Sequence, residues 1–154
     1  MLKFIPMNEN DFLEFWKIAV DQWKTDMENA GLMEKNTSYE EAEKYTEKIL
    51  PKGMNTTGHK MMNIFDDDKK IGSIWFELRE RVGLKEIYLW DIIIDEEYRS
   101  KGYGKATMSL LEEFAKNEGA VRISLNVFGS NRIARNLYTK IGYYEAAITM
   151  IKYL

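Results

Sequence analysis

The spacing of apolar residues along this chain changes repeatedly between strand and helix periodicity, so elements of both kinds are expected. Residues 3–5 read as a short strand. From Asn8 or Asn10 to about Ala30, apolar side chains recur every three or four residues, which predicts an amphipathic helix closed by Gly31. Its broad apolar face should pack in the core and consists of Phe12, Phe15, Trp16, Ala19, Val20, Trp23 and Met27. Trp23 or Met27, near the end of this helix, could also wall a substrate pocket.

Ser38 and Glu41 have the spacing of a capping box, which predicts a second helix that stops at Pro51. Strands are then expected at residues 60–65, 71–81 and 86–94. The middle strand should present different side chains on its two faces, with Ile74, Phe76 and Leu78 on one and Ser73, Trp75 and Glu77 on the other. His59 begins the first of these strands, either as a partly exposed strand residue or as a contact or proton acceptor for a substrate.

The last third of the chain repeats this alternation. A helix follows Gly104 and ends at Gly119, residues 121–127 form a β-branched run typical of a strand, and Ser130 or Asn131 starts a helix that ends at Gly142. Residues 143–154 allow one long strand. The resulting order β-α-α-β-β-β-α-β-α-β predicts a mixed α/β fold, and it spans residues 1–154 as a single domain because no linker or repeat divides the chain.

Composition narrows the classes of function. A chain of 154 residues with 45% hydrophobic and 31% charged residues is typical of one soluble domain. The net charge of −3 argues against a nucleic-acid partner. Without cysteine and with His59 as the only histidine, neither a thiol nucleophile nor a thiolate or multi-histidine metal site is expected. We expect a cytoplasmic protein without a membrane partner, because no signal peptide and no apolar run near the roughly 18 residues of a membrane span is found.

The densest chemical signal lies in residues 88–119. A β-rich apolar run is followed by a turn that contains Gly102 and Gly104, and this turn opens an amphipathic helix. Glycine lets backbone approach a ligand closely, and the first turn of a helix has unpaired N–H groups that favour anions. Arg99, Lys101 and Lys105 add positive charge around the turn. Together these features predict a pyrophosphate site.

Two common phosphate motifs do not fit this turn. A P-loop needs a glycine where Arg99 stands, and a dinucleotide fingerprint needs a glycine where Thr107 stands. The remaining pattern, Arg-x-x-Gly-x-Gly at residues 99–104 after a strand that ends in three isoleucines, resembles the acetyl-CoA signature of the GNAT superfamily of N-acetyltransferases. Residues 126–143, which contain Asn126, Asn131 and Tyr138, resemble the second signature of that family.

The resemblance covers about residues 88–144 and implies the GNAT fold, a mixed and mostly antiparallel central sheet flanked by helices. It also implies acetyl-CoA as a co-substrate and no metal. Backbone groups of the three isoleucines would pair with the pantetheine arm, the glycine turn would hold the pyrophosphate, and two asparagines match cofactor positions. The cofactor-binding residues so implied are Ile92, Ile93, Ile94, Arg99, Ser100, Lys101, Gly102, Tyr103, Gly104, Lys105, Asn126 and Asn131.

Acetyl transfer to an amine requires a held thioester, an uncharged nucleophile and a proton for the departing thiolate. Tyr138 falls where the family commonly places a tyrosine as general acid, and a phenol with a pKa of about 10 stays protonated at neutral pH. An alkylammonium has a pKa of about 10.4, so the reaction also needs a proton acceptor. Asp91 and Glu77 are the two candidates. One polyamine-acetylating branch of the family has Glu-Asp where this chain has Trp90 and Asp91, and this difference counts against that activity.

Three functional interpretations remain. The first is an acetyl-CoA-dependent N-acetyltransferase whose acceptor is a primary amine on a small molecule or a peptide. The second is a non-catalytic acyl-CoA-binding sensor domain, which the lack of an obvious base keeps open. The third, a structural or nucleic-acid-binding module, predicts no CoA binding.

Residues 143–154 barely permit the two terminal strands of many family members, so a second subunit in a homodimer could complete the sheet edge.

Overall fold

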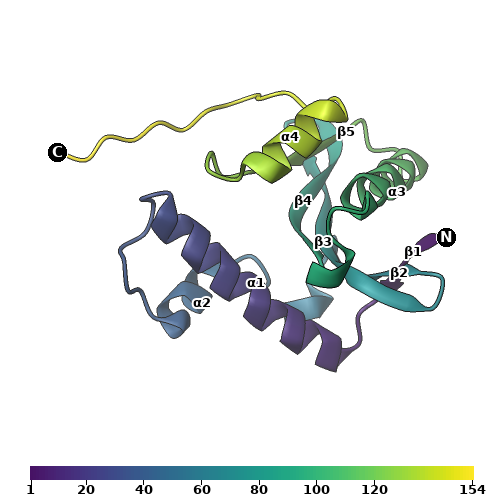
Figure 1. The fold of residues 1–154 in the computed structure, drawn as a ribbon, viewed down its shortest axis with the longest axis horizontal. Coiled ribbons are helices and arrows are strands. Elements are labelled where there is room, and N and C mark those ends of the chain that lie inside the picture. The colour runs from purple at the N-terminus through teal and green to yellow at the C-terminus, as the bar shows by residue number, and fades with distance from the viewer.

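Five strands form one sheet in the computed structural model, which describes all 154 residues (Figure 1). Their order in the sheet is β1-β2-β3-β4-β5; the first four are antiparallel neighbours, and β5 runs parallel to β4. The strands are β1 (Leu2–Pro6), β2 (His59–Asp66), β3 (Lys69–Arg81), β4 (Leu84–Ile94) and β5 (Arg122–Leu125). The predicted mixed and mostly antiparallel sheet is confirmed.

Helices cover both faces of this sheet, with α1 and α2 on one face and α3 and α4 on the other (Figure 1). They are α1 (Glu9–Asn29), α2 (Tyr39–Glu47), α3 (Tyr103–Asn117) and α4 (Arg132–Lys140), with single turns η1 (Gly53–Asn55) and η2 (Glu96–Tyr98). The predicted capping box is present, since Ser38 and Glu41 each accept a hydrogen bond from the other's backbone N–H. None of the helices combines the length and the apolar character needed to cross a membrane.

Two apolar clusters lie on opposite faces of the sheet, as the alternation in β3 predicts. Ile74 and Phe76 are fully buried with Met108 and Leu111 of α3, whereas Trp75 packs with Phe15 of α1 on the other face. The second cluster is rich in aromatic contacts, because the Trp75 ring meets Phe15 and Trp16 edge to face at centroid distances of 6.5 and 5.6 Å. The amphipathic face of α1 is thereby fixed against the sheet.

The C-terminal segment differs from its prediction. Residues 143–154 form no strand, and the chain after α4 runs away from the sheet as an extended, exposed tail (Figure 1). A strand is stable only where its backbone groups find a partner, and this segment has no neighbouring strand in its own chain. Two smaller differences concern element ends: β5 ends at Leu125 instead of residue 127, and α2 ends at Glu47 instead of about residue 50.

Gly72 provides a test of how closely β3 and β4 approach one another. A Cβ atom at this position would overlap the carbonyl oxygen of Ile93, which lies in the neighbouring strand. We predict that Gly72→Ala lowers the free energy of unfolding by about 2 kcal/mol or more, because backbone atoms on both strands would have to move. Gly129→Ala is the matched control, since nothing lies within 4 Å of its added Cβ. Urea unfolding that gives equal losses for the two variants would contradict this description of the sheet.

Candidate active site

The site begins where β4 loses its second neighbour. Trp75 of β3 pairs with Asp91 and Phe76 pairs with Leu89, so Trp90 is an extra residue that forms a bulge in β4. Strand β5 pairs only with Glu86 to Leu89 of β4. Beyond the bulge, β4 keeps its pairing with β3, but its other edge has no strand partner up to Ile94. Bulges of this kind bend a strand and redirect its side chains. Backbone groups of alternate residues face alternate sides of a strand, and those of Ile93 face β3. The backbone of Ile92 and the N–H of Ile94 are therefore free to pair with an extended ligand.

The glycine turn after β4 forms an anion cradle. Ser100 and Gly102 adopt left-handed backbone conformations, with φ of 60° and 85°, and α3 begins directly after Gly102 without a capping side chain. None of the N–H groups of residues 100–105 donates to another backbone group; the first one in α3 that does is that of Ala106, to the carbonyl of Gly102. Unpaired N–H groups at the N-terminus of a 15-residue helix attract anions. The predicted pyrophosphate site thus has its donors available.

Side chains of the turn tie it to the rest of the molecule. Arg99 Nε donates to the carbonyl of Ile94 at 2.9 Å, which joins the turn to the end of β4. Tyr103 donates from its hydroxyl to Asp66 at 2.9 Å, and Lys101 Nζ lies 5.7 Å from the centre of the Tyr98 ring. Gly104 has a packing role, because a Cβ there would come within 3.2 Å of Leu137 in α4. Lys105 is exposed at the start of α3.

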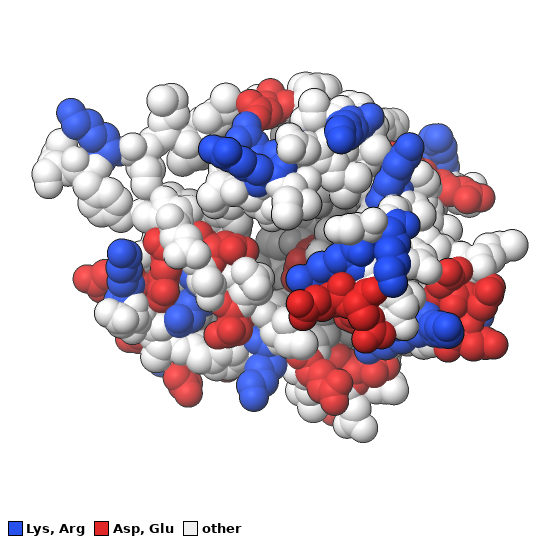
Figure 2. Space-filling view, viewed as in Figure 1, with Lys and Arg blue, Asp and Glu red and all other residues white.

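A cavity of about 250 Å³ opens in the gap between β4 and β5 and is closed by α1, α2 and α4. Figure 2 shows the same face hollowed between α1 and α4. Five of the residues singled out from the sequence line this cavity: Asp91, Ile92, Asn126, Asn131 and Tyr138. Trp23 also lines it, whereas Met27, His59 and Glu77 do not. The fold therefore brings together residues of α1, of β4, of the loop between β5 and α4, and of α4.

The charge of Asp91 acts on Tyr138, a second ionisable group that lines this cavity. Burial raises the pKa of Asp91 to about 6, the backbone N–H of Ile92 opposes this rise, and the charge of Asp26 adds to it. Tyr138 is only 9% exposed, and burial together with the charge of Asp91 raises its pKa to about 12. Near neutral pH the pair thus consists of a carboxylate that can accept a proton and a phenol that can donate one.

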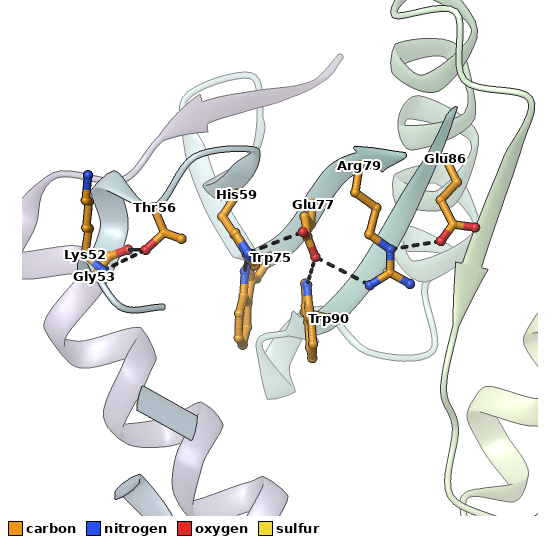
Figure 3. Close-up of polar contacts among 9 residues, drawn as sticks. All are labelled: Lys52, Gly53, Thr56, His59, Trp75, Glu77, Arg79, Glu86 and Trp90. Atoms are coloured by element: carbon orange, nitrogen blue, oxygen red, sulfur yellow. Dashed lines mark hydrogen bonds and ion pairs between the residues drawn. The ribbon is translucent and has the colours of Figure 1, made fainter. Parts of the chain in front are cut away.

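Glu77, the other predicted base, has three partners on the same sheet face (Figure 3). Trp90 Nε1 donates to its carboxylate at 3.0 Å, Arg79 lies 3.6 Å away, and His59 Nε2 lies 3.7 Å away. His59 in turn accepts a hydrogen bond at Nδ1 from Trp75 Nε1 at 3.0 Å. Burial, aided by the charge of Arg79 and opposed by that of Glu77, lowers the pKa of His59. Neutral His59 therefore directs its Nε2 proton toward Glu77.

The same line of polar contacts continues into the interior. Arg79 donates from Nε to Glu86 at 2.9 Å, and Arg122 of β5 donates to the other oxygen of that carboxylate. Burial alone would raise the pKa of Glu86, but these two arginines hold it below its ordinary value. Breaking one partner of a buried pair is costly, so the network fixes β3, β4 and β5 in register. It also fixes the indole rings of Trp75 and Trp90, which stack at a centroid distance of 5.1 Å.

Asn131 caps α4, as its position before that helix predicts, and its predicted contact with the cofactor stays a prediction. Its side-chain oxygen accepts a hydrogen bond from the N–H of Ala134 at 3.1 Å and so caps α4, and the same residue lines the cavity. Asn126 follows β5 and also lines the cavity.

The lining residues that the sequence did not indicate are mainly aromatic. They are Trp16, Tyr45, Trp75 and Trp90, together with the acidic Asp26. The sequence does contain one indication of this wall: Trp16 and Trp23 lie seven residues apart, and this spacing places both on the same face of α1.

Asp91→Asn should reveal the raised pKa as a change in stability. The pKa of about 6 in the folded chain exceeds the unfolded value of about 3.9, so the wild type loses stability as pH rises through 6. Asparagine carries no charge, and we predict that the variant is more stable than wild type by about 1–3 kcal/mol at pH 8, with this gain shrinking toward pH 4. Chemical unfolding across this range measures the effect, with exposed Asp68→Asn as the control. A gain that does not depend on pH would show that Asp91 is not desolvated.

Comparison with known proteins identifies the family of this chain. Residues 11–143 match the acetyltransferase (GNAT) family. The uncharacterized N-acetyltransferase YdgE of Bacillus subtilis is 29% identical over 149 residues, which cover 96% of this chain and 95% of YdgE. The crystal structure of Bacillus subtilis YycN superposes with a TM-score of 0.94, at 24% identity over 100% of this chain and 99% of YycN. AAC(6')-Iy, in complex with the bisubstrate analog CoA-S-monomethyl-acetylneamine, superposes with a TM-score of 0.58 at 14% identity, over 100% of this chain and 98% of its own. The chain belongs to the GNAT family of N-acetyltransferases, which use acetyl-CoA.

Proposed function

We propose that this protein transfers the acetyl group of acetyl-CoA to a primary amine, which attacks the thioester directly. One observation carries the proposal: Asp91 and Tyr138 line a single cavity at the point where β4 has a free edge, just before the anion cradle. Direct attack requires mainly that the two reactants be held in line, and positioning alone contributes effective molarities of about 10⁵ M or more. No covalent enzyme intermediate is needed.

The cofactor would be held almost entirely by backbone. The N–H groups of residues 100–105 would receive the pyrophosphate, and Arg99, Lys101 and Lys105 would add positive charge. The pantetheine arm would extend along the free edge of β4 and pair with the backbone of Ile92 and Ile94, like an added strand. An N–H from this strand end would stabilise negative charge on the thioester oxygen as the amine attacks. Asn126 and Asn131 would contact the cofactor from the opposite wall.

The coupling between Asp91 and Tyr138 suggests an order for the proton transfers. Asp91 would accept a proton from the bound ammonium, directly or through water, and the neutral amine that results would then attack the thioester. Protonation removes the negative charge that helps to raise the pKa of Tyr138. Tyr138 therefore becomes a better acid at the stage when the thiolate leaves, and its proton would pass to the sulfur. Glu77 is the weaker candidate for the base, because Trp90, Arg79 and His59 occupy its carboxylate outside the cavity lining.

The lining of the cavity favours a compact amine with an apolar or aromatic body. Most of its walls are apolar, and four tryptophans contribute to them: Trp16, Trp23, Trp75 and Trp90. Aromatic faces attract a cation, and the carboxylate of Asp26 adds a negative charge beside Asp91. A volume of about 250 Å³ is small compared with sites for drug-sized ligands. A free amino acid derivative, an arylalkylamine or the first residue of a peptide would fit this description better than a long polycation.

Turnover with an amine panel tests the proposal. We predict that thiol release from acetyl-CoA accelerates with at least one compact primary amine, and that Tyr138→Phe lowers kcat by roughly 10²-fold because the thiolate loses its acid. The affinity for acetyl-CoA, measured by calorimetry, should stay within about twofold. Tyr144→Phe is the control, since Tyr144 is exposed after α4.

Two results would change the assignment. Binding of acetyl-CoA without turnover across a broad amine panel would favour the sensor domain. An unchanged kcat in Tyr138→Phe would remove this residue from the mechanism.

Gly102→Val tests the cradle. Gly102 has φ of +85° at the start of α3 and nothing within 4 Å of a built Cβ, so the side chain would fill the space in front of the N–H groups. We predict a loss of CoA affinity of about 30-fold or more. Gly83→Val is a matched control, because Gly83 has φ of +74° with equally open surroundings and lies in the turn between β3 and β4. Both variants should lose similar stability through backbone strain, and equal affinities for CoA in the two would place the phosphates elsewhere.

A further inference from the structure

Both charged residues that line the active-site cavity are acidic. They are Asp26, in the last turn of α1, and Asp91 of β4, and the lining contains no lysine, arginine or histidine. The cavity opens between α1 and α4 (Figure 2). A ligand that enters it therefore meets negative charge without a compensating positive side chain.

Asp26 keeps its negative charge available to such a ligand. Its side chain is half-buried, forms no ion pair, and accepts one hydrogen bond at Oδ1, from Nε2 of Gln22 at 3.1 Å. The nearby Lys24 pairs with Glu28 instead, with 3.2 Å between Nζ and Oε1. The charge of Asp26 also reaches Asp91, whose pKa it helps to raise, and no basic side chain opposes that rise. The two carboxylates therefore act on the same space.

The position of Asp26 is unfavourable for the helix that carries it. The C-terminal end of a helix carries partial negative charge, so a carboxylate in the last turn is disfavoured and a basic residue there is stabilising. Helix α1 has no basic residue in its last turn. The stability of α1 does not account for a carboxylate at this position, whereas attraction of a cationic ligand does.

The basic residues near the site lie at its cofactor end or behind its walls. Arg99, Lys101 and Lys105 surround the glycine turn, and Arg79 and Arg122 bind the buried Glu86. None of these basic residues lines the cavity. A carboxylate on the acceptor would thus lose its water beside two like charges, without a cation to pair with.

The walls that α1 and α2 contribute also offer few neutral donors to a carboxylate. The Thr46 hydroxyl donates to the carbonyl of Glu43 at 2.7 Å, and Tyr45 is 63% exposed. Aromatic rings such as those of Trp16 and Trp23 attract a cation instead. The same walls therefore favour an ammonium group and disfavour a carboxylate.

We propose, on the basis of the acetyl transfer proposed above, that the acceptor is a compact amine with no carboxylate beside its ammonium group, and that Asp26 determines this choice. Asp26 attracts the ammonium and repels an adjacent carboxylate, so the site selects an amine over the free amino acid that has the same side chain. Asp91 then accepts the proton of the bound ammonium. The two carboxylates of the cavity thereby divide recognition and proton transfer between them.

Matched pairs of acceptors test this selection. Phenylalaninol and phenylalanine share a side chain and a protonated amine, but the first has a neutral hydroxymethyl group where the second has a carboxylate. Leucinol with leucine and tryptophanol with tryptophan extend the comparison to other side chains. We predict that in at least one pair kcat/KM for the amino alcohol exceeds that for the amino acid by about 100-fold or more. Calorimetry with coenzyme A bound should show a preference for the amino alcohol in Kd as well.

Asp26→Asn removes the charge and keeps the size and shape of the side chain. The preference for the amino alcohol should fall by about tenfold, chiefly through KM, because Asp91 is then the only charged residue of the lining. Circular dichroism should show an unchanged fold, since the charge does not stabilise α1. Asp21→Asn is the matched control: Asp21 lies on the same helix, is exposed and does not line the cavity, so this variant should keep the full preference.

The outcomes separate the choice of acceptor from the reaction itself. Preferential binding of the amino alcohols without turnover would support charge selection by Asp26 and contradict acetyl transfer. Equal kcat/KM for both members of every pair would support acetyl transfer and contradict charge selection. No measurable binding of any amino alcohol, or a preference that persists in full in Asp26→Asn, would overturn the assignment of Asp26.

Discussion

The backbone edge of β4 beyond Leu89 is the feature on which the rest of the site depends. Buried backbone groups are nearly always paired, so a strand that keeps one neighbour and loses the other leaves a row of unsatisfied donors and acceptors. Here β5 ends its pairing at Leu89, and the bulge at Trp90 turns β4 away from it. An extended ligand can supply the missing partner. The turn that follows provides a second set of unpaired N–H groups, which suits the charged end of such a ligand.

Rigid surroundings keep this gap open. Glu86 is buried and bound by Arg79 and Arg122, which joins three strands at the end of the sheet where β4 and β5 still pair. Arg79 also lies near Glu77, whose carboxylate positions the Trp90 indole. A chain of charges on one side of the gap thus holds the aromatic walls of the cavity. These apolar walls exclude water from Asp91, and this burial raises the pKa of its carboxyl group.

The sequence predicted the parts of the fold and site that depend on local order. The glycine turn, the helix that follows it and the capping residues Ser38 and Asn131 are short-range features, and the structure confirms them. The choice between Asp91 and Glu77 depends on which strand face meets α1 and on where the bulge lies. The spacing of neighbouring residues in the sequence predicts neither of these. The periodicity of the first helix predicts Trp16 and Trp23 as core residues and leaves open that Trp23 walls a pocket, because apolar periodicity does not distinguish a core from a pocket. The tail was predicted as a strand, and its own chain offers it no partner.

Amide hydrogen exchange in the presence of two ligands would test the central claim most directly. Coenzyme A should slow exchange both at residues 92–94 and at residues 100–105, since it supplies a pantetheine arm and a pyrophosphate. Pantetheine, which lacks the phosphates, should slow exchange at residues 92–94 only. If coenzyme A binds without changing exchange at residues 100–105, or protects a different part of the chain, the free backbone of β4 and of the turn is not what holds the cofactor.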